Sequence, residues 1–378
     1  MSALLPLAVA VPVLTAALLT AGGTRVNRTA ANLIATVAAL AVTAICLVIL
    51  LHPGSAPIVT WFGGWEPRNG VPIGVDFAVD DVGAGLAVFI AVLTVLALVM
   101  LAHYRETDPP HLQALILVFC AGMIGFVFSG DLFDMFVFFE LMSVSAFALT
   151  GFRSRHEESL AGALNFAITN TVGSIVLLFG IGLVYGRTGA LNLAAIGEQL
   201  GAAPIDGLVV VAFALIVAGF LIKAAAVPFH FWLADAYAVA PTPICLLLAG
   251  AMSELGLFGI GRVWFASFAD AFGQHGADVG LVLIACGADT ALFGGVMCIA
   301  QDHLKRMLAF ATIAYVGIFL IGLGTLSEDG VAGAALFVVS DGANKAALFG
   351  AVGILQHRKA DVSERGCAAP ATPATTWR

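Results

Sequence analysis

The sequence predicts an all-α protein, a polytopic bundle of about eleven transmembrane helices. Of its 378 residues, 61% are hydrophobic and only 11% are charged, whereas soluble domains carry about 25% charged residues. The mean hydropathy is +1.03. Apolar residues form long runs instead of alternating with polar ones, which excludes an outer-membrane barrel.

Eleven apolar runs have the length that a membrane helix requires, because a hydrocarbon core about 30 Å thick needs about 20 residues per helix. They are 3–22, 30–51, 82–102, 112–130, 133–151, 162–185, 208–227, 243–265, 277–300, 308–325 and 331–356. The first run lacks the charged start of a signal peptide and further spans follow at once, so we expect it to remain as the first transmembrane helix.

The distribution of cationic residues predicts the orientation, since cytoplasmic loops are enriched in Lys and Arg. With the N-terminus outside, the cytoplasmic side carries Arg25, Arg28, Arg105, Arg153, Arg155, Lys305, Arg306, Arg358, Lys359, Arg365 and Arg378. The opposite side carries Arg68 and Arg187, with Arg262 near a helix end. We therefore expect a multi-pass protein of the inner cell membrane with a cytoplasmic C-terminus.

The sequence lacks the residues that several classes of protein function require. No CxxC pair occurs, which argues against zinc, iron–sulfur and disulfide sites. The eight histidines lie in predicted loops or near helix ends, so an electron-transfer subunit with haem in the membrane is disfavoured. No basic cluster suits a nucleic acid. We expect neither a metal nor a cofactor.

Glu140 and Lys223 lie inside apolar runs, where a charged side chain costs at least about 2.5 kcal/mol. The helix that carries Lys223 meets Pro228 five residues later, and a proline disrupts the turn that precedes it. We expect this helix to break just beyond Lys223, as is tolerated where it is buried in protein or lines a water-filled cavity. Alternatively, Lys223 extends to the membrane interface.

Opposite charges are tolerated together and costly apart, so we expect Glu140 and Lys223 to face each other or a shared polar cavity. Burial favours the neutral form of each group and pairing favours the charged forms, so a pair that can be made and broken is a proton switch. The alternative for Glu140 is a purely structural ion pair or a neutral hydrogen-bonded acid. His230, two residues after Pro228, is either a further proton carrier or an interfacial residue.

Further charges occur in later spans: Glu254, Asp289, Asp341 and Lys345. Asp341 and Lys345 are four residues apart and share a helix face, as a relay or as a self-neutralising pair. Asp289 is either a functional residue or a residue with a role in packing alone. Lys305 lies at the start of a helix on the expected cytoplasmic side. The positive charge there could also serve membrane orientation or contact with lipid headgroups instead of proton transfer.

Four segments resemble one family of membrane proteins: FFELMSVSAFALTGF, FLIKAAAVPFHFWLADAYAVAPTP, HLKRMLAFATIAYVG and NKAALFGAVG. They resemble the antiporter-like subunits of respiratory complex I, Mrp-type cation/proton antiporters and energy-converting hydrogenases, over residues 75–357 and in the same order. The resemblance implies that Glu140 and Lys223 are the glutamate of the fifth helix and the lysine of the seventh helix in a proton path.

The sequence departs from the family pattern at three points. Glu254 stands where the family usually has a lysine or a nearby histidine, and Asp341 stands where a histidine is frequent. The family has about fourteen helices in two inverted five-helix repeats, whereas this sequence reaches about eleven. We therefore expect N-terminal helices in 1–104, a first repeat in 112–265, a shortened second repeat in 277–356 and a low-complexity cytoplasmic tail in 357–378.

The resemblance implies proton translocation, or cation/proton exchange, by a subunit of an NADH:quinone oxidoreductase-like, hydrogenase-like or Mrp-like complex. Glu140, Lys223, Glu254, Asp341 and Lys345 would be the proton relay. Partners would be other membrane subunits and a soluble redox arm. The transported ions would be protons, with Na⁺ as a second candidate. A free-standing secondary transporter and a shortened, inactive remnant stay open as alternatives.

Overall fold

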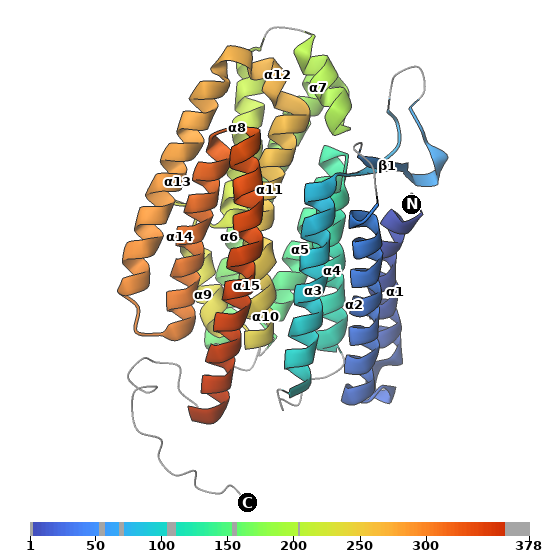
Figure 1. Cartoon of the computed structure of the whole chain (residues 1–378), viewed down its shortest axis with the longest axis vertical. Coiled ribbons are helices and arrows are strands. Elements are labelled where there is room, and N and C mark those ends of the chain that lie inside the picture. The colour runs from blue at the N-terminus through green and yellow to red at the C-terminus, as the bar shows by residue number, and fades with distance from the viewer. Residues whose placement is uncertain are drawn as a thin grey trace, which may run out of the picture.

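The computed structural model describes residues 3–52, 57–67, 72–103, 111–152, 157–202 and 205–359. These residues form a bundle of long helices with a small two-stranded sheet at one end (Figure 1). The first elements are α1 Leu4–Gly22, α2 Arg28–Leu50, β1 Ile58–Trp61, β2 Asp76–Val79, α3 Asp81–His103, α4 His111–Phe128 and α5 Leu132–Thr150. They are followed by α6 Glu157–Thr188, α7 Leu193–Gly201, α8 Gly207–Ala224 and α9 Phe231–Val239. The last are α10 Thr242–Leu247, α11 Ser253–Val263, α12 Ala269–Phe272, α13 Gly276–Ile299, α14 Leu304–Gly324 and α15 Glu328–Lys359.

The expected transmembrane helices are confirmed in the described residues, where ten segments are long and apolar enough to cross a membrane. Nine of them coincide with one expected span each. The tenth, Thr242–Ile299, is 58 residues long and contains the spans expected at 243–265 and 277–300. Gly273, at φ +46°, lies in the short turn that separates its two halves. Most of the expected tail lies outside the described residues.

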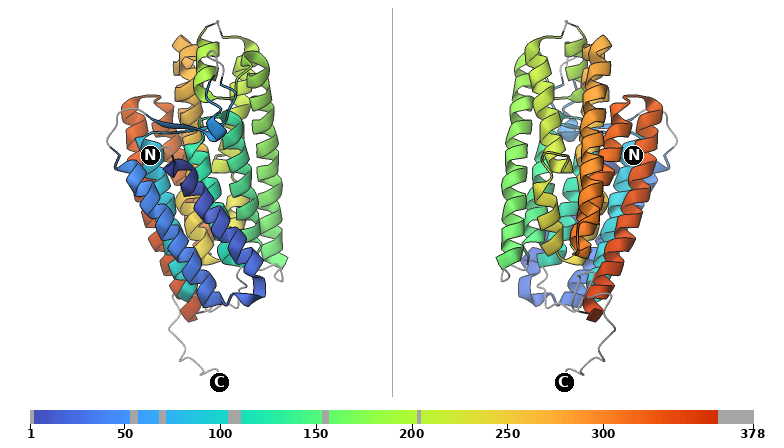
Figure 2. Two further views of the ribbon diagram at one scale, coloured as in Figure 1. Left: turned by 90° about the vertical axis from the view of Figure 1, so that its right-hand side faces the viewer. Right: turned by 90° about the vertical axis from the view of Figure 1, so that its left-hand side faces the viewer.

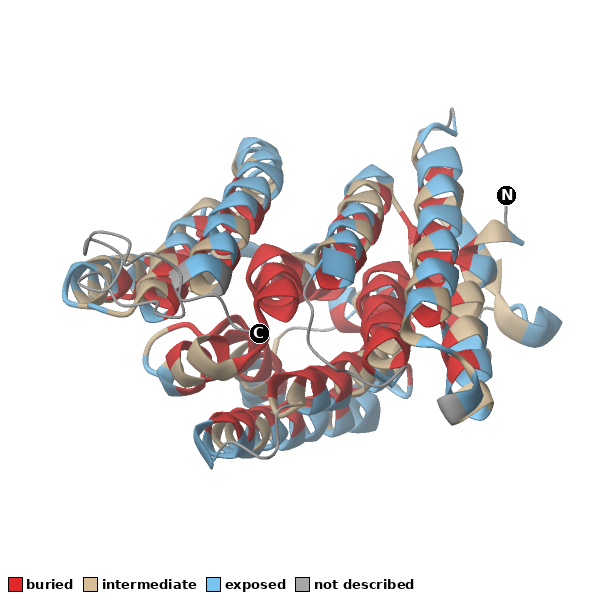
Figure 3. Ribbon diagram, turned by 90° about the horizontal axis from the view of Figure 1, so that it is seen from below, coloured by how far each residue is buried: buried red, intermediate tan, exposed pale blue. Residues whose placement is uncertain are grey.

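The helices enclose a buried centre (Figure 3). α1 and α2 pack on α3 and α4 along one side of the bundle, while α13 and α14 pair along the other side (Figures 1 and 2). α4 is buried along most of its length. The outer faces of the peripheral helices are exposed and apolar, as is required of surfaces that contact lipid.

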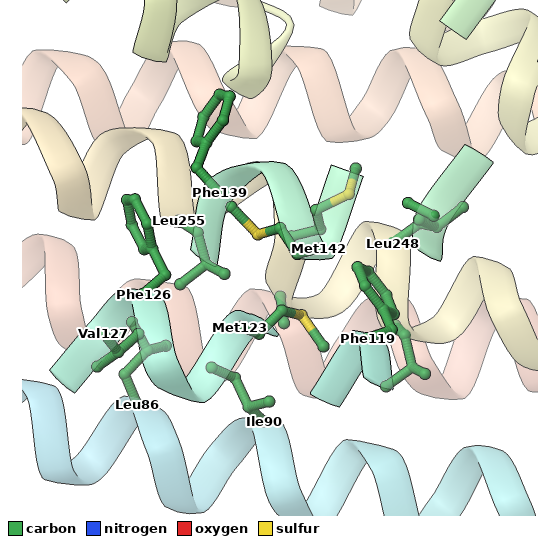
Figure 4. Packing of buried hydrophobic residues seen from close by; sticks show 14 of the residues in the cluster. Leu86, Ile90, Phe119, Met123, Phe126, Val127, Phe139, Met142, Leu248 and Leu255 are labelled. Atoms are coloured by element: carbon green, nitrogen blue, oxygen red, sulfur yellow. The ribbon is translucent and has the colours of Figure 1, made fainter. Parts of the chain in front are cut away.

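Side-chain packing joins the helices in the centre. Figure 4 shows Leu86 of α3 beside Val127 of α4 and Ile90 of α3 beside Met123 of α4, with Met142 of α5 close by. Lipid tails are as apolar as leucine, so association within the membrane depends on close van der Waals packing more than on the hydrophobic effect. Gly317 of α14 supplies such packing, because a Cβ there would collide with the backbone of α13 at Ala291.

An antiparallel hairpin closes one end of the bundle. β1 pairs with β2, with Ile58 opposite Val79 and Trp61 opposite Asp76. Arg262, at the end of α11, donates hydrogen bonds to the carboxylate of Asp80 and to the carbonyl of Ala78. This contact ties the hairpin and the start of α3 to α11. The sequence indicated only a connector here, not paired strands.

Candidate functional site

The helix that carries Lys223 is interrupted directly after this residue, between α8 and α9. α8 ends where Ala225 adopts the left-handed conformation at φ +58°, and α9 begins at Phe231. The Val227 N–H donates to Thr290 Oγ1 of α13 at 3.1 Å, and the indole of Trp232 donates to the Ile222 carbonyl at 3.0 Å. These contacts satisfy backbone groups that the break exposes, and the predicted break is confirmed.

Lys223 is fully buried in the last turn of α8. Its Nζ donates a hydrogen bond to Ser143 Oγ of α5 at 2.5 Å and lies 4.7 Å from the centre of the Phe139 ring. The ammonium therefore has one hydroxyl and one aromatic face as close partners, and aromatic faces attract cations. Lys223 does not extend to the membrane interface.

Glu140 is half-buried on α5, three residues before Ser143 and on the same helix face. Its Oε1 accepts a hydrogen bond from Ser174 Oγ of α6. Glu140 and Lys223 were expected to face each other or a shared polar cavity. The shared polar cavity stays a prediction, and no direct ion pair joins the two groups among the contacts of the described residues. The reason is that each charged group takes a serine hydroxyl as its partner, Ser174 for Glu140 and Ser143 for Lys223.

Glu254, Lys345 and Asp341 form a buried triad in the middle of the bundle. Lys345 Nζ of α15 lies 2.7 Å from Glu254 Oε1 of α11 and also forms an ion pair with Asp341 Oδ2, one turn earlier on α15. All three residues are at most 3% exposed. Glu254 therefore faces the interior of the bundle and Lys345.

A hydroxyl pair lies next to this triad. Tyr237 of α9 is fully buried, and its hydroxyl lies 3.0 Å from Ser253 Oγ, on the residue that precedes Glu254. A π-helical turn, Leu248–Met252, comes directly before Ser253. Such turns are frequent at functional sites because they shift side chains out of the regular helical register. Tyr237 thus connects the part of the chain after the break to α11.

Three secondary candidates lie apart from these groups. His230 precedes α9, with its ring 4.4 Å from that of Phe293 and its Nδ1 buried without a hydrogen-bond partner. Asp289 is exposed on the outer face of α13. Lys305 is buried at the start of α14 and donates to the Ala240 carbonyl at 2.9 Å, so contact with lipid headgroups does not explain its position.

Asp76, the first residue of β2, lies outside the membrane-spanning segments. Its side chain is part of a buried polar cluster with Asn192 and Asp131. Its Oδ1 accepts a hydrogen bond from Asn192 Nδ2 at 2.9 Å. Burial, aided by the nearby carboxylate of Asp131, raises the pKa of Asp76 to about 6. The described residues contain no group of three or more His, Cys, Asp or Glu that could hold a metal ion.

Four residues of the site were missed by reasoning from the sequence: Ser143, Ser174, Tyr237 and Ser253. Ser143 could have been found, because it lies three residues after Glu140 in an apolar helix. Ser253 directly precedes Glu254 and gives a similar signal. Ser174 and Tyr237 belong to other helices, and only the packing of the bundle shows which polar groups they meet.

Comparisons with known proteins identify a single family. The model of the family described as NADH:quinone oxidoreductase/Mrp antiporter, transmembrane, matches residues 129–368. The chain is 35% identical over 321 residues to NADH-quinone oxidoreductase subunit N of Desulforudis audaxviator, covering 84% of this chain and 62% of that protein. The chain therefore spans about three fifths of that relative's length.

Two solved structures have the same fold. A subunit of the membrane-bound sulfane sulfur reductase, described as an archaeal respiratory membrane complex, superposes with a TM-score of 0.86 at 25% identity, covering 96% of this chain and 73% of that one. A subunit of the Mrp complex from Dietzia sp. gives a TM-score of 0.80 at 27% identity, covering 94% and 65%. Both similarities extend over nearly all of this chain.

Proposed function

The chain belongs to the NADH:quinone oxidoreductase/Mrp antiporter transmembrane family, and we propose that it translocates protons as a membrane subunit of a larger respiratory or cation-exchange complex. The observation that carries this proposal is the buried triad of Glu254, Lys345 and Asp341. An ionisable group inside a membrane bundle is costly, and such groups commonly mark ion pathways.

The composition of the triad suits reversible protonation. Two carboxylates share one ammonium, so the fully ionised triad carries one excess negative charge, which is costly to bury. Glu254 Oε1 faces Lys345, whereas its buried Oε2 has no hydrogen-bond partner. A proton taken up on Oε2 removes the excess charge and leaves Lys345 paired with Asp341. Loss of that proton restores the pair with Glu254.

Lys223 and Glu140 would supply the other half of the relay. Among the described residues, Ser143 is the one hydrogen-bond partner of Lys223. A serine hydroxyl both donates and accepts, so it can take part when the lysine releases its proton. The hydroxyl of Tyr237, which follows the break, contacts the hydroxyl of Ser253, the residue before Glu254, and this pair would connect the two halves of the relay. Glu140, with Ser174 as its partner, would set the charge that Lys223 experiences.

The assembly around the chain is part of the same proposal. The proposed partners are other membrane subunits and a soluble redox arm, in the inner membrane with the N-terminus outside. Subunits of the sulfane sulfur reductase and of the Mrp complex share the fold, which supports the proposal that other membrane subunits are partners. The two repeats expected at 112–265 and 277–356, and coupling to Na⁺, are proposed on the family resemblance.

The proposal is tested by proton flux in vesicles that contain the intact complex. We expect Lys223→Met to lower the flux at least about 100-fold, the lower end of what a positioned proton-transfer group contributes. Ser145→Ala is the matched control, because Ser145 is buried on α5 near Ser143 but donates only to Leu141 of its own helix. Unchanged flux in Lys223→Met, or uptake of a solute without any partner subunit, would contradict the proposal.

A further inference from the structure

α9 is too short to cross the membrane and depends on its neighbours for its position. Its nine residues extend about 13 Å at 1.5 Å per residue, less than half of a hydrocarbon core about 30 Å thick. The side chain of His230, at its N-cap position, makes no capping hydrogen bond. Its end is followed by Pro241, which has no N–H and cannot continue the helix. Contacts from other helices must therefore hold α9 in place.

The helix pair α13 and α14 holds α9 at both ends. Before its start, the Val227 N–H donates to Thr290 Oγ1 of α13. At its end, Lys305 Nζ of α14 donates to the carbonyl oxygen of Ala240, the C-cap residue, at 2.9 Å. Lys305 is only 2% exposed and Ala240 is fully buried. α13 and α14 lie side by side (Figure 1), so both contacts come from one packed unit.

A third contact holds the side of α9. Asp235 accepts a hydrogen bond from Asn165 Nδ2 of α6 at 3.2 Å, and its other oxygen forms an ion pair with Arg306 of α14 at 3.1 Å. Asp235 and Arg306 are both partly exposed, and exposed ion pairs contribute little. A hydrogen bond from a charged group is stronger when it is buried, as that of Lys305 is. Lys305 is therefore the main support that α14 gives to α9.

The charge of Lys305 suits α9 better than it suits α14. A cation is favoured near the carboxyl end of a helix and disfavoured near the amino end, because the unpaired carbonyls and N–H groups there carry opposite partial charges. Lys305 is the second residue of α14, at the amino end. Through the Ala240 carbonyl, its ammonium contacts the carboxyl end of α9 instead. It thus caps a helix other than its own.

Tyr237 lies one turn before Ala240, on the part of α9 that Lys305 holds. Its hydroxyl is 3.0 Å from Ser253 Oγ, on the residue before Glu254. A side-chain contact at about 3.6 Å is no longer a hydrogen bond, so a shift of α9 by about 1 Å would break this one. A displacement of that size, caused by a change away from the chemistry, can reduce a rate about 100-fold.

We propose that Lys305 is a positioning residue of the proton relay, which holds the end of α9 so that Tyr237 meets Ser253. The inference rests on the proposed function, since it assigns a role within the same relay. Lys305 does not itself carry the proton. Its acceptor at Ala240 is a backbone carbonyl, which accepts a hydrogen bond but has no proton to pass on.

Arginine separates positioning from proton transfer, because a guanidinium keeps the charge and the donors but is not deprotonated in proteins. Proton flux is measured in vesicles that contain the intact complex, and it is divided by the amount of assembled complex. We expect Lys305→Met to lower the flux at least about 10-fold and Lys305→Arg to recover most of it. Arg358→Met is the control, because it removes an exposed cation at the same end of the bundle, and it should leave the flux unchanged (Figure 1).

A double-mutant cycle tests whether Lys305 acts through Tyr237. Tyr237→Phe removes the hydroxyl that Lys305 positions, so adding Lys305→Met to it should lower the flux by no more than about 2-fold further. Two reductions that multiply as independent effects would overturn the proposal. Equal losses of flux in Lys305→Met and Lys305→Arg would also overturn it, because the site would then need a group that releases a proton.

Two outcomes keep the test decisive. If Lys305→Met does not assemble, Lys305→Arg decides alone: retained flux supports positioning, and loss of flux in an assembled complex contradicts it. The proposed function fails separately, if Lys223→Met leaves the flux unchanged. If Lys223→Met lowers the flux and an assembled Lys305→Met complex does not, only the role of Lys305 is overturned.

Discussion

Serine hydroxyls decide how the buried charges of this chain are held. Lys223 and Glu140 do not contact each other; Ser143 serves the first and Ser174 the second. Such an arrangement avoids a fixed ion pair, which would hold both groups in their charged forms. Glu254 and Lys345, in contrast, are in direct contact. The two sets of buried charges therefore differ: one is held by serine hydroxyls and the other by direct ion pairs.

Ser143→Ala is expected to destabilise the protein by about 1.5–3 kcal/mol, because a buried ammonium loses its hydrogen-bond acceptor. The measurement is the free energy of unfolding of the purified protein in detergent. Ser145→Ala, which removes a hydroxyl bonded only within α5, should change it by less than about 0.5 kcal/mol. Equal effects of the two changes would contradict the assigned role of Ser143.

At the scale of elements, the break between α8 and α9 is the main departure from regular structure in the described residues. Pro228 predicted its position, because proline cannot continue the helix. The hydrogen bonds that stabilise the break were seen only in the structure. The Val227 N–H donates to Thr290 Oγ1 of α13, and the Trp232 indole donates to the Ile222 carbonyl. Without these partners, exposed backbone groups in an apolar environment would each cost several kcal/mol.

Replacing Thr290 tests this support of the break. Thr290→Val keeps the shape but removes the acceptor of the Val227 N–H, so we expect a loss of about 1–3 kcal/mol in unfolding free energy. Thr290→Ser retains the hydroxyl and should recover most of that loss. If Val and Ser variants were equally stable, another group would have to satisfy the backbone of the break.

The hairpin offers a test by pH. The pKa of Asp76 is raised from 3.8 to about 6, so between these values the folded protein binds more protons than the unfolded one, and stability falls as pH rises through this window. Asp76→Asn should therefore raise unfolding free energy by about 1–2 kcal/mol at pH 7 and have little effect near pH 4. The measurement is thermal unfolding in detergent between pH 4 and 8.

Asp206 is the control of opposite sign. The Val209 N–H and Arg187 hold the pKa of Asp206 below its ordinary value. The ionised Asp206 therefore stabilises the folded protein at pH values above its ordinary pKa, and this stabilisation is lost as the pH falls. Asp206→Asn should lower the unfolding temperature at pH 7 and lose that effect in acid. A rise at pH 7 in both variants would contradict the electrostatic account.

For the whole molecule, hydropathy was sufficient to predict the eleven spans, because each must bury about 20 apolar residues in lipid. Helical spacing also predicted the shared face of Asp341 and Lys345. The packing between helices could not be predicted from local patterns. It places Tyr237 against Ser253 and Glu254 against Lys345, across 16 and 91 residues of sequence, and leaves Asp289 on the outer surface.

The central claim is that Glu254 carries a proton. The most direct measurement is proton flux through the intact complex in vesicles, comparing Glu254→Gln with Glu198→Gln, the same change at an exposed position of α7. A glutamine keeps the shape of Glu254 but cannot bind or release a proton in the working pH range. We predict at least about a 100-fold loss of flux for Glu254→Gln and none for Glu198→Gln. Full flux in Glu254→Gln, with the complex intact, would contradict the claim.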